Sequence, residues 1–256
     1  MKLERIARYC RAGNKAVSFI AVVVILLMMS YGGFSLYDDW KMTHGDFESE
    51  LMQFAPNEKN NYSLAQLMEL NPEVRGWLKI DDTHINYPVL QGEDDMKYVN
   101  TDPLGEFSLS GSIFLSSVND PDFQDAYSLV YGHHIENGAM FGDITRFLDE
   151  KYFDSHQKGS LQDGKGNFWT IDIFSVLETD ASNQMAFDPN PWKTNAAGLI
   201  SYLEQNAVHF KKDTVHPEDH IIGLSTCYDT RTNGRVLVFG KLTPAKAPSS
   251  KSDSTN

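Results

Sequence analysis

Residues 220–227 read HIIGLSTC, and residues 235–242 read RVLVFGKL. Both stretches are rich in Ile, Val, Leu and Phe over about eight residues, which is typical of buried β-strands. The loop between them is of hairpin length and ends in Asn-Gly. If the two strands pair antiparallel, the last residue of the first lies opposite the first residue of the second. The sequence therefore predicts that Cys227 lies beside Arg235 at the mouth of a hairpin.

Other short apolar stretches with turn residues between them precede this hairpin and predict a β-barrel or sandwich. These strand candidates are residues 77–80, 84–90, 111–115, 127–131 and 168–177. Two helical inserts interrupt them. One is predicted over Met140–Leu148, and the other follows Pro189 and Pro191, with an apolar stripe at Leu199, Leu203, Ala207 and Phe210. We expect a mostly β domain with helices.

The N-terminus predicts a membrane anchor. Residues 1–15 hold five basic residues and one acidic residue, and Ala16–Tyr31 carries no charge. With its apolar flank to Phe34 this run would span roughly 28 Å as a helix, close to the hydrocarbon core of a bilayer. A cleavable signal peptide is the alternative, but its apolar region is usually shorter, roughly 7–15 residues, and ends at a small-residue site.

We interpret residues 1–15 as a cytoplasmic basic segment and residues 16–34 as an uncleaved transmembrane anchor, with the rest of the chain outside the cell. Residues 35–72 form a helical region, since Leu36, Trp40, Phe47, Leu51 and Phe54 recur at roughly helical spacing. Residues 73–243 form the β domain, and residues 244–256 are predicted to be disordered. The net charge of −13 argues against nucleic acid as a partner.

The chain has two cysteines, and on this topology Cys10 and Cys227 lie on opposite sides of the membrane. An unpaired thiol outside the cell is an oxidation liability, so Cys227 is either a reactive nucleophile or a buried, inert side chain. A nearby imidazole can share the thiol proton. Arginine stays charged, so it can hold a carbonyl oxygen as negative charge develops. Arg235 suits this role better than Arg231, which lies near the loop apex.

The histidine partner is best sought at His133-His134, which follow the apolar strand 127–131 and Gly132. His220 precedes Cys227 by seven residues on the same strand, too far to reach the thiol. Metal binding is the alternative for a histidine pair, but adjacent residues on extended backbone point in opposite directions and no third ligand is evident. The residues alone leave the choice between His133 and His134 open.

These motifs together resemble those of the sortases. Leu224-Ser225-Thr226-Cys227 followed by Arg235 resembles the sortase signature, and Tyr131-Gly132-His133-His134 resembles the histidine motif of that family. Residues 76–92, 98–100 and 111–114 are similar to class B sortases in particular. The resemblance covers about residues 36–242. One position departs from it, because Gly223 stands where the signature usually has threonine.

The resemblance implies a closed or nearly closed β-barrel of about eight strands, with N-terminal helices and a helical insert before the cysteine strand. It implies a cysteine transpeptidase without metal or cofactor. Cys227 would cleave a C-terminal sorting motif of secreted proteins after threonine and form a thioester. His133, which directly follows the glycine of the motif, would protonate the leaving amine, and Arg235 would hold the substrate carbonyl oxygens or the oxyanion. Asn100, Ser225 and Tyr228 are the predicted substrate contacts.

The implied acceptor is an amine of the lipid-linked cell-wall precursor, which the anchored enzyme would meet at the membrane. A class B sortase that polymerises pilins instead uses a pilin lysine as the acceptor, and no residue in the sequence decides between the two. A plain cysteine peptidase and a non-enzymatic surface binding module remain as further alternatives.

Overall fold

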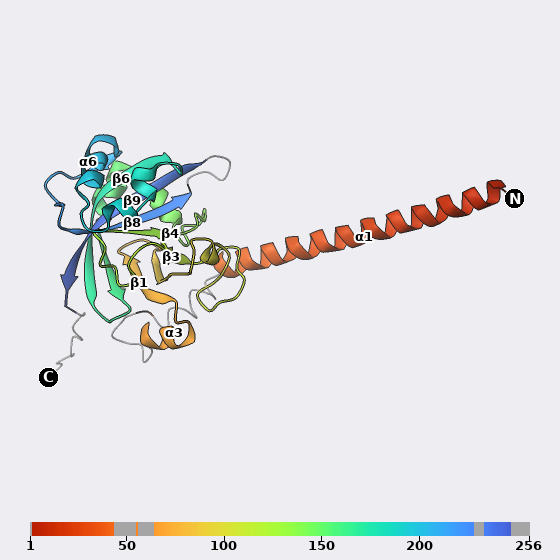
Figure 1. Ribbon diagram of the computed structural model, residues 1–256, viewed down its shortest axis with the longest axis horizontal. Helices are drawn as coiled ribbons and strands as arrows, with labels where there is room; N and C mark the ends of the chain where they lie inside the picture. The colour runs from red at the N-terminus through yellow and green to blue at the C-terminus, as the bar shows by residue number, and fades with distance from the viewer. Residues whose placement is uncertain (1, 44–54, 56–63, 228–232, 247–256) are drawn as a thin grey trace. The chain divides into compact units, whose positions relative to one another are not determined.

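The structure is a computed structural model, and it describes residues 2–43, 55, 64–227 and 233–246 (Figure 1). Of Cys227 and of several residues near the ends of the first helix it describes the backbone alone. The chain divides into two compact units, Met1–His44 and Gly45–Asn256. Each unit is described by itself.

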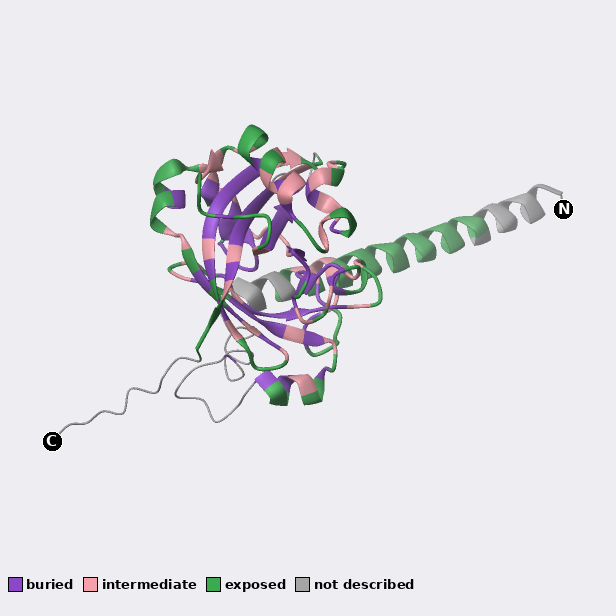
Figure 2. Cartoon of the chain, turned by 60° about the vertical axis from the view of Figure 1, so that its left-hand side comes forward, coloured by how far each residue is buried: buried purple, intermediate pink, exposed green. Residues whose placement is uncertain are grey.

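The first unit is the helix α1, Lys2–Thr43. Within the described part of the chain it is the one helix long and apolar enough to cross a membrane, over the 25 residues Gly13–Tyr37. At 1.5 Å per residue these would span about 37 Å, enough for a tilted crossing. The apolar side chains of this stretch are exposed within the unit (Figure 2). The helix is compatible with a membrane anchor. It continues beyond the predicted anchor, 16–34, whereas the apolar residues Phe47 to Phe54 lie outside the described residues.

The second unit is a β-barrel with helical decoration. Its described residues form nine strands: β1 Val74–Ile80, β2 Asn86–Leu90, β3 Ile113–Leu115, β4 Tyr127–Tyr131, β5 Lys158–Asp163, β6 Phe168–Asp180, β7 His209–Phe210, β8 His220–Cys227 and β9 Gly234–Ala245. The strand order is β5-β1-β2-β3-β4-β8-β9-β6, and pairing of β5 with β6 closes the ring. The short strand β7 pairs with β6 outside that ring. The predicted closed barrel of about eight strands is confirmed.

Short helices lie between the strands: α3 Leu64–Leu70, α4 Glu150–Ser155, α5 Gln184–Phe187 and α6 Ala197–Asn206, with the 3₁₀-helices η1 Lys97–Val99, η2 Gly142–Leu148 and η3 Asn190–Trp192. The helix predicted over Met140–Leu148 is therefore a 3₁₀-helix and starts two residues later. The predicted stripe on the second insert extends too far, because the helix ends at Asn206 and Phe210 lies in β7.

Strand β5 was not predicted, because its sequence, KGSLQD, has one large apolar residue. Its buried positions alternate nonetheless, at Gly159, Leu161 and Asp163. Asp163 is fully buried and accepts a hydrogen bond from the indole N–H of Trp169 on β6, 3.2 Å away. Because its carboxylate is hydrogen-bonded, Asp163 can occupy a buried position on the strand. The alternation of apolar and polar residues would have assigned that position to an apolar side chain.

Two apolar layers hold the second unit together. Helix α6 covers the outer face of the barrel, where Leu199 and Leu203 belong to a cluster with Tyr127, Leu129, Phe174, Leu177, Ile221, Leu237 and Phe239. Ile222 lies next to Ile221 on β8 and faces the interior, since neighbouring residues on a strand face opposite sides. There the small Gly240 makes room for Ile171, whose Cγ2 lies 2.4 Å from where a Cβ on residue 240 would be. Figure 2 shows the strands as buried along most of their length.

Gly223 of β8, the position that departs from the threonine of the sortase signature, is covered by an aromatic ring. A Cβ at residue 223 would lie 2.7 Å from the hydroxyl of Tyr127 and 2.8 Å from its ring. That hydroxyl donates to the carbonyl of Ala186 in α5, 2.8 Å away. Tyr127 therefore takes the space of the missing side chain and ties α5 to the barrel.

Gly223→Thr should destabilise the second unit by about 1–3 kcal/mol, because the new side chain overlaps Tyr127 in a packed layer. Tyr127→Leu alone should also destabilise it, since the Ala186 carbonyl loses its donor. In the double variant the two effects should be less than additive, because the smaller leucine side chain leaves room for threonine. Urea unfolding of the four proteins tests this, and strictly additive free energies would contradict the overlap.

Candidate active site

A cavity of about 410 Å³ opens on the second unit where several strands end. It collects residues from β3, from the ends of β4, β8 and β9, from the segment around η1, and from the segment that follows β6. The lining residues are Asp95, Met96, Val99, Phe114, Tyr131, Gly132, His133, Ala181, Phe187, Ser225, Thr226 and Arg235. Most of them present apolar surface, with a few polar groups among them, which is the usual composition of a binding pocket.

The pairing of three strands brings the predicted site residues to this cavity. β8 and β9 are antiparallel, with Cys227 opposite Arg235, as the sequence predicts. β4 and β8 are parallel, with Tyr131 opposite Ser225. Gly132, which follows Tyr131, donates its backbone N–H to the Ser225 carbonyl, 3.1 Å away. The segment that starts at His133 therefore begins next to the end of the cysteine strand. The side chain of Cys227 and all of Tyr228 lie outside the described residues.

His133 lines the cavity, and its ring is held by a backbone carbonyl. Its Nε2 lies 2.8 Å from the carbonyl oxygen of Val99, next to η1. A carbonyl oxygen can only accept a hydrogen bond, so Nε2 must carry a hydrogen. In the neutral imidazole this leaves Nδ1 without a hydrogen, as the basic nitrogen. The structure thus gives the ring a defined tautomer.

His134 lies elsewhere. It pairs with Met140 across a short turn, and it does not line the cavity. Its Nδ1 is buried and has no hydrogen-bond partner among the described residues. In the part of the chain that the structure describes, no three His, Cys, Asp or Glu side chains come together as a metal site.

Arg235 supplies positive charge in the cavity wall. It is half-buried, and its Nη1 donates to the carbonyl of Gly234, 3.0 Å away. Hydrogen bonds from Ser182 lower the pKa of Asp180, and the field of Arg235 lowers it further. A guanidinium held at a strand end is suited to hold an oxygen on which negative charge develops.

Comparisons with known proteins identify the family. A model of the sortase domain matches residues 78–243 of the chain. Sortase B of Listeria monocytogenes is 34% identical over 182 residues, which cover 70% of this chain and 73% of that protein. The chain belongs to the sortase family.

Solved structures place it in class B. A Streptococcus pyogenes class B sortase involved in pilus biogenesis aligns with a TM-score of 0.65 and 34% identity, over 70% of this chain and 97% of that one. Sortase B from Bacillus anthracis aligns with a TM-score of 0.67 and 29% identity, over 83% and 99% of the two chains. The resemblance found in the sequence is confirmed, and the family makes the protein a cysteine transpeptidase.

The three predicted substrate contacts of this sortase differ in where they lie relative to the cavity. Ser225 lines the cavity and is buried. Asn100 follows η1, is exposed, and is not among the lining residues. Tyr228 lies outside the described residues.

Sequence reasoning missed most of the cavity wall. Ala181 and Phe187 come from the segment after β6, which carries no reactive group and gave no signal. Val99 contributes a backbone carbonyl, which no side-chain pattern can reveal. Asp95 belongs to the acidic run Glu93-Asp94-Asp95, far before the histidine motif, and nothing in the sequence sets it apart from its neighbours. Its carboxylate accepts from the backbone N–H of Ser117 at 2.6 Å and from the Ser116 hydroxyl at 3.0 Å.

Tyr131 places a protonated hydroxyl group next to these residues. Burial raises the pKa of Tyr131 well above its usual value, and the nearby Asp95 carboxylate raises it further. The side chain therefore stays neutral over the whole range in which an enzyme works, and it can donate a hydrogen bond.

The segment that carries His133 is fastened to the barrel at its far end. Met140 donates its N–H to the hydroxyl of Tyr87 on β2, 3.0 Å away. Asp143, at the start of η2, is 2% exposed. Its Oδ2 lies 2.9 Å from the N–H of His84 and 2.8 Å from Nδ1 of the same residue, and Arg146 donates to its Oδ1. Because one buried carboxylate joins the β1–β2 turn to η2, the histidine segment is held at both ends.

Asp143→Asn should destabilise the protein by about 2 kcal/mol, since it weakens charge-assisted hydrogen bonds in a buried position. Burial raises the pKa of Asp143, but the hydrogen bonds from His84 and Arg146 outweigh it, so the pKa lies below its usual 3.8. The carboxylate therefore stabilises the fold fully above that value, and this contribution is lost as the pH falls through the lower folded pKa.

Urea unfolding between pH 7 and pH 2 tests this expectation, since the loss is expected below about pH 3.8. The difference in stability between the native protein and Asp143→Asn should shrink toward acid. Asp172→Asn is the control, because Asp172 forms an exposed ion pair with Lys158, and it should cost well under about 1 kcal/mol. A difference for Asp143→Asn that does not vary with pH would contradict the assignment.

Proposed function

We propose that this sortase cleaves a C-terminal sorting motif of secreted proteins after threonine and transfers the acyl group to an amine of the cell-wall precursor. The observation that carries the proposal is the cavity shared by His133 and Arg235, at the end of the strand that finishes at Cys227. A nucleophile, a base and a fixed positive charge at one opening are what acyl transfer requires.

In the first half-reaction the Cys227 thiol gives its proton to Nδ1 of His133, and the sulfur attacks the carbonyl carbon of the threonine. Arg235 holds the oxygen as it becomes negative. The bond to the next residue then breaks, and the imidazolium returns the proton to the leaving amine. The product is a thioester between Cys227 and the substrate.

In the second half-reaction an acceptor amine attacks the thioester carbonyl and gives its proton to His133. The carbon–sulfur bond breaks, the thiolate is regenerated, and it recovers a proton from the imidazolium. Water is the competing nucleophile. The apolar side chains of Met96, Phe114 and Phe187 in the cavity wall favour a bound acceptor over bulk water. Ser225 is the substrate contact that the cavity supports, while Asn100 and Tyr228 remain predictions.

The anchor gives this chemistry its location. We assign residues 1–15 to the cytoplasm, residues 16–34 to the membrane, and the catalytic domain, residues 73–243, to the outer surface. The basic N-terminus and the apolar helix α1 support this topology. A substrate and a lipid-linked acceptor held in the same membrane meet the enzyme at a raised local concentration.

Pilin polymerisation is the second candidate function. The similarity to a Streptococcus pyogenes class B sortase involved in pilus biogenesis favours it. The two functions share the first half-reaction and differ in the acceptor, which is a pilin lysine in one case and a wall-precursor amine in the other.

Mass spectrometry of the full-length protein, after exposure to a library of sorting peptides, should find an acyl adduct on Cys227. Cys227→Ala should abolish the adduct, and His133→Ala should slow its formation by roughly 10²–10⁴-fold. Cys10→Ala and His134→Ala are the matched controls and should still form it. If His134→Ala is the crippling change, the assignment of the base is wrong.

The same assay identifies the acceptor. An oligoglycine-like amine that consumes the adduct faster than water does supports wall anchoring, and consumption by a pilin lysine alone supports polymerisation. If water releases the acyl group from Cys227 at the same rate with or without an amine present, the protein is a peptidase and the proposal is contradicted.

Arg235→Lys should lower the rate of acyl transfer by about 10²-fold or more, because a single ammonium cannot replace the two-pronged guanidinium donor. Arg231→Lys, in the adjacent loop, should keep nearly the native rate. Steady-state kinetics with the best peptide from the library measure both. Near-native activity of Arg235→Lys would remove the oxyanion role.

A further inference from the structure

The carbonyl that holds the His133 ring adjoins a very short element. η1 is a single 3₁₀ turn, Lys97–Val99, and its own backbone hydrogen bond is a long one, from the Val99 N–H to the Met96 carbonyl at 3.3 Å. One such turn does not fix its own orientation. The direction of the Val99 carbonyl must therefore be set by contacts outside η1.

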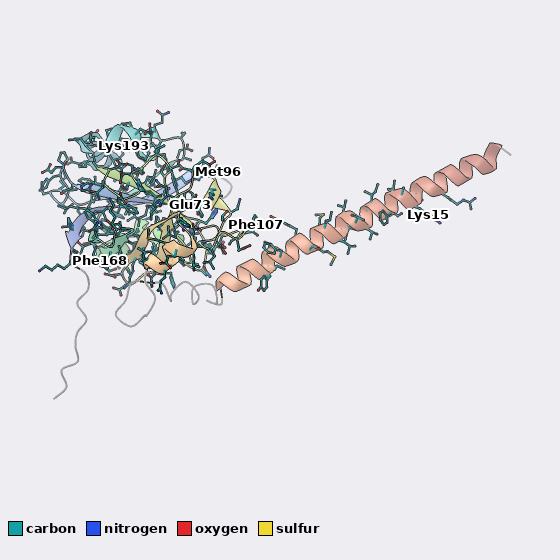
Figure 3. All side chains as sticks on the ribbon, turned by 60° about the horizontal axis from the view of Figure 1, so that its bottom comes forward. Lys15, Glu73, Met96, Phe107, Phe168 and Lys193 are labelled. Carbon is teal, nitrogen blue, oxygen red and sulfur yellow. The ribbon has the colours of Figure 1, made fainter. Side chains whose placement is uncertain are left out.

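Tyr98 provides the first of these contacts. The residue is 1% exposed. Its hydroxyl donates to Oε2 of Glu73 at 2.6 Å and accepts from Nδ2 of Asn71 at 3.2 Å. Asn71 and Glu73 precede β1, so the middle residue of η1 is tied to the wall of the barrel. Lys97 adds an ion pair to the same Glu73 oxygen, 2.5 Å away. Figure 3 shows Glu73 and Met96, the residue before η1, on the same side of the domain.

The hydrogen-bonded groups of Glu73 and Tyr98 keep the same protonation state around neutral pH. Burial raises the pKa of Glu73, but the hydrogen bonds from Lys97 and Tyr98 outweigh it and hold the pKa below its usual 4.5. Burial and the hydrogen bond to Glu73 raise the pKa of Tyr98 to about 12. Around neutral pH the carboxylate is charged and the hydroxyl is protonated, so the bond between them persists.

Gly111 provides the second contact. It precedes β3 and has a left-handed backbone, φ +59°. A Cβ at this position would lie 2.3 Å from the Val99 carbonyl oxygen and 2.5 Å from that of Tyr98. The neighbouring Ser112 donates its N–H to the Tyr98 carbonyl, 2.9 Å away. The backbone of residues 111–112 thus packs directly against the two carbonyls of η1, and it can do so because residue 111 has no side chain.

We propose that Tyr98 and Gly111 are positioning residues for proton transfer in this sortase. They fix the Val99 carbonyl, and that carbonyl keeps the hydrogen of His133 on Nε2 and Nδ1 toward the reaction. Neither residue touches the imidazole, and both act through one backbone oxygen. The inference rests on the proposed role of His133 as the base, and it adds the source of the ring's orientation.

Two substitutions test the proposal on the full-length protein in detergent. Tyr98→Phe removes one oxygen and leaves the buried ring, so η1 should keep its place but lose its anchor. Gly111→Ala places a methyl group against the Val99 carbonyl and should displace it. We expect kcat for acyl-enzyme formation to fall about tenfold in the first and about 10²-fold in the second, with KM little changed, because a reacting group is misplaced rather than substrate binding lost.

Gly105→Ala is the matched control for Gly111→Ala. Gly105 lies in the same β2–β3 connection and also has a left-handed backbone, φ +91°, but a Cβ there would meet nothing within 4 Å. The substitution imposes backbone strain without touching η1, and kcat should stay within about threefold of native. If Gly105→Ala and Gly111→Ala lose equal activity, backbone strain explains both and the proposal fails.

The second readout does not depend on activity. In protein labelled with ¹⁵N-histidine, the Nε2–H of His133 should give a proton resonance protected from exchange with water by its hydrogen bond, assigned by its loss in His133→Ala. Tyr98→Phe and Gly111→Ala should speed its exchange at least tenfold, while Gly105→Ala should not. Unchanged protection in Tyr98→Phe would overturn the proposal, whatever happens to kcat.

The exchange measurement also distinguishes failure of the proposed function from failure of this inference. Native activity of His133→Ala would refute the proposed function, yet the exchange measurement would still report whether Tyr98 and Gly111 hold the ring. If Gly111→Ala does not fold, Tyr98→Phe and Gly105→Ala still decide the outcome.

Discussion

The antiparallel register of β8 with β9 is the constraint on which the rest of the site depends. It sets Cys227 opposite Arg235, and the parallel pairing of β4 with β8 then brings Gly132 and His133 to the same strand end. A slip by one residue would turn each side chain to the other face of the sheet. The closed barrel and the layer under α6 oppose such a slip, because Ile221 must face outward while Ile222 faces the interior. Packing outside the cavity wall thereby helps to fix which residues meet in it.

Much of this arrangement follows from sequence because it depends on residue type. The apolar runs of β8 and β9 identify two buried strands, and a hairpin-length loop between them fixes which ends meet. The closed barrel and the family came from several motifs in order, which together are far more specific than a cysteine or a histidine alone. The apolar run after the basic N-terminus gave the helix α1 in the same way, although the helix continues further than the run predicts.

Other features could not be predicted because they depend on geometry or on backbone atoms. β5 has one large apolar side chain and a buried aspartate, so it lacks the usual strand pattern. The residues alone left the choice between two adjacent histidines open and the resemblance selected His133; the structure adds that His133 lies in the cavity wall and His134 in a turn beside Met140. The partner of the imidazole is a carbonyl oxygen, which every residue possesses. The loop after Cys227 lies outside the described residues, so its contribution to the wall stays a prediction.

The use of a main-chain oxygen to hold the imidazole has an evolutionary consequence. In many hydrolases the corresponding group is an aspartate side chain, which a single codon change can remove. Here the acceptor survives any substitution of Val99 that preserves the path of the backbone. Met96, three residues before Val99, also lines the cavity. Its side chain can therefore change as one substrate replaces another, while the oxygen that holds the imidazole stays in place. This separation of substrate contacts from the imidazole acceptor would let the same fold evolve to recognise new sorting signals without losing activity at an intermediate step.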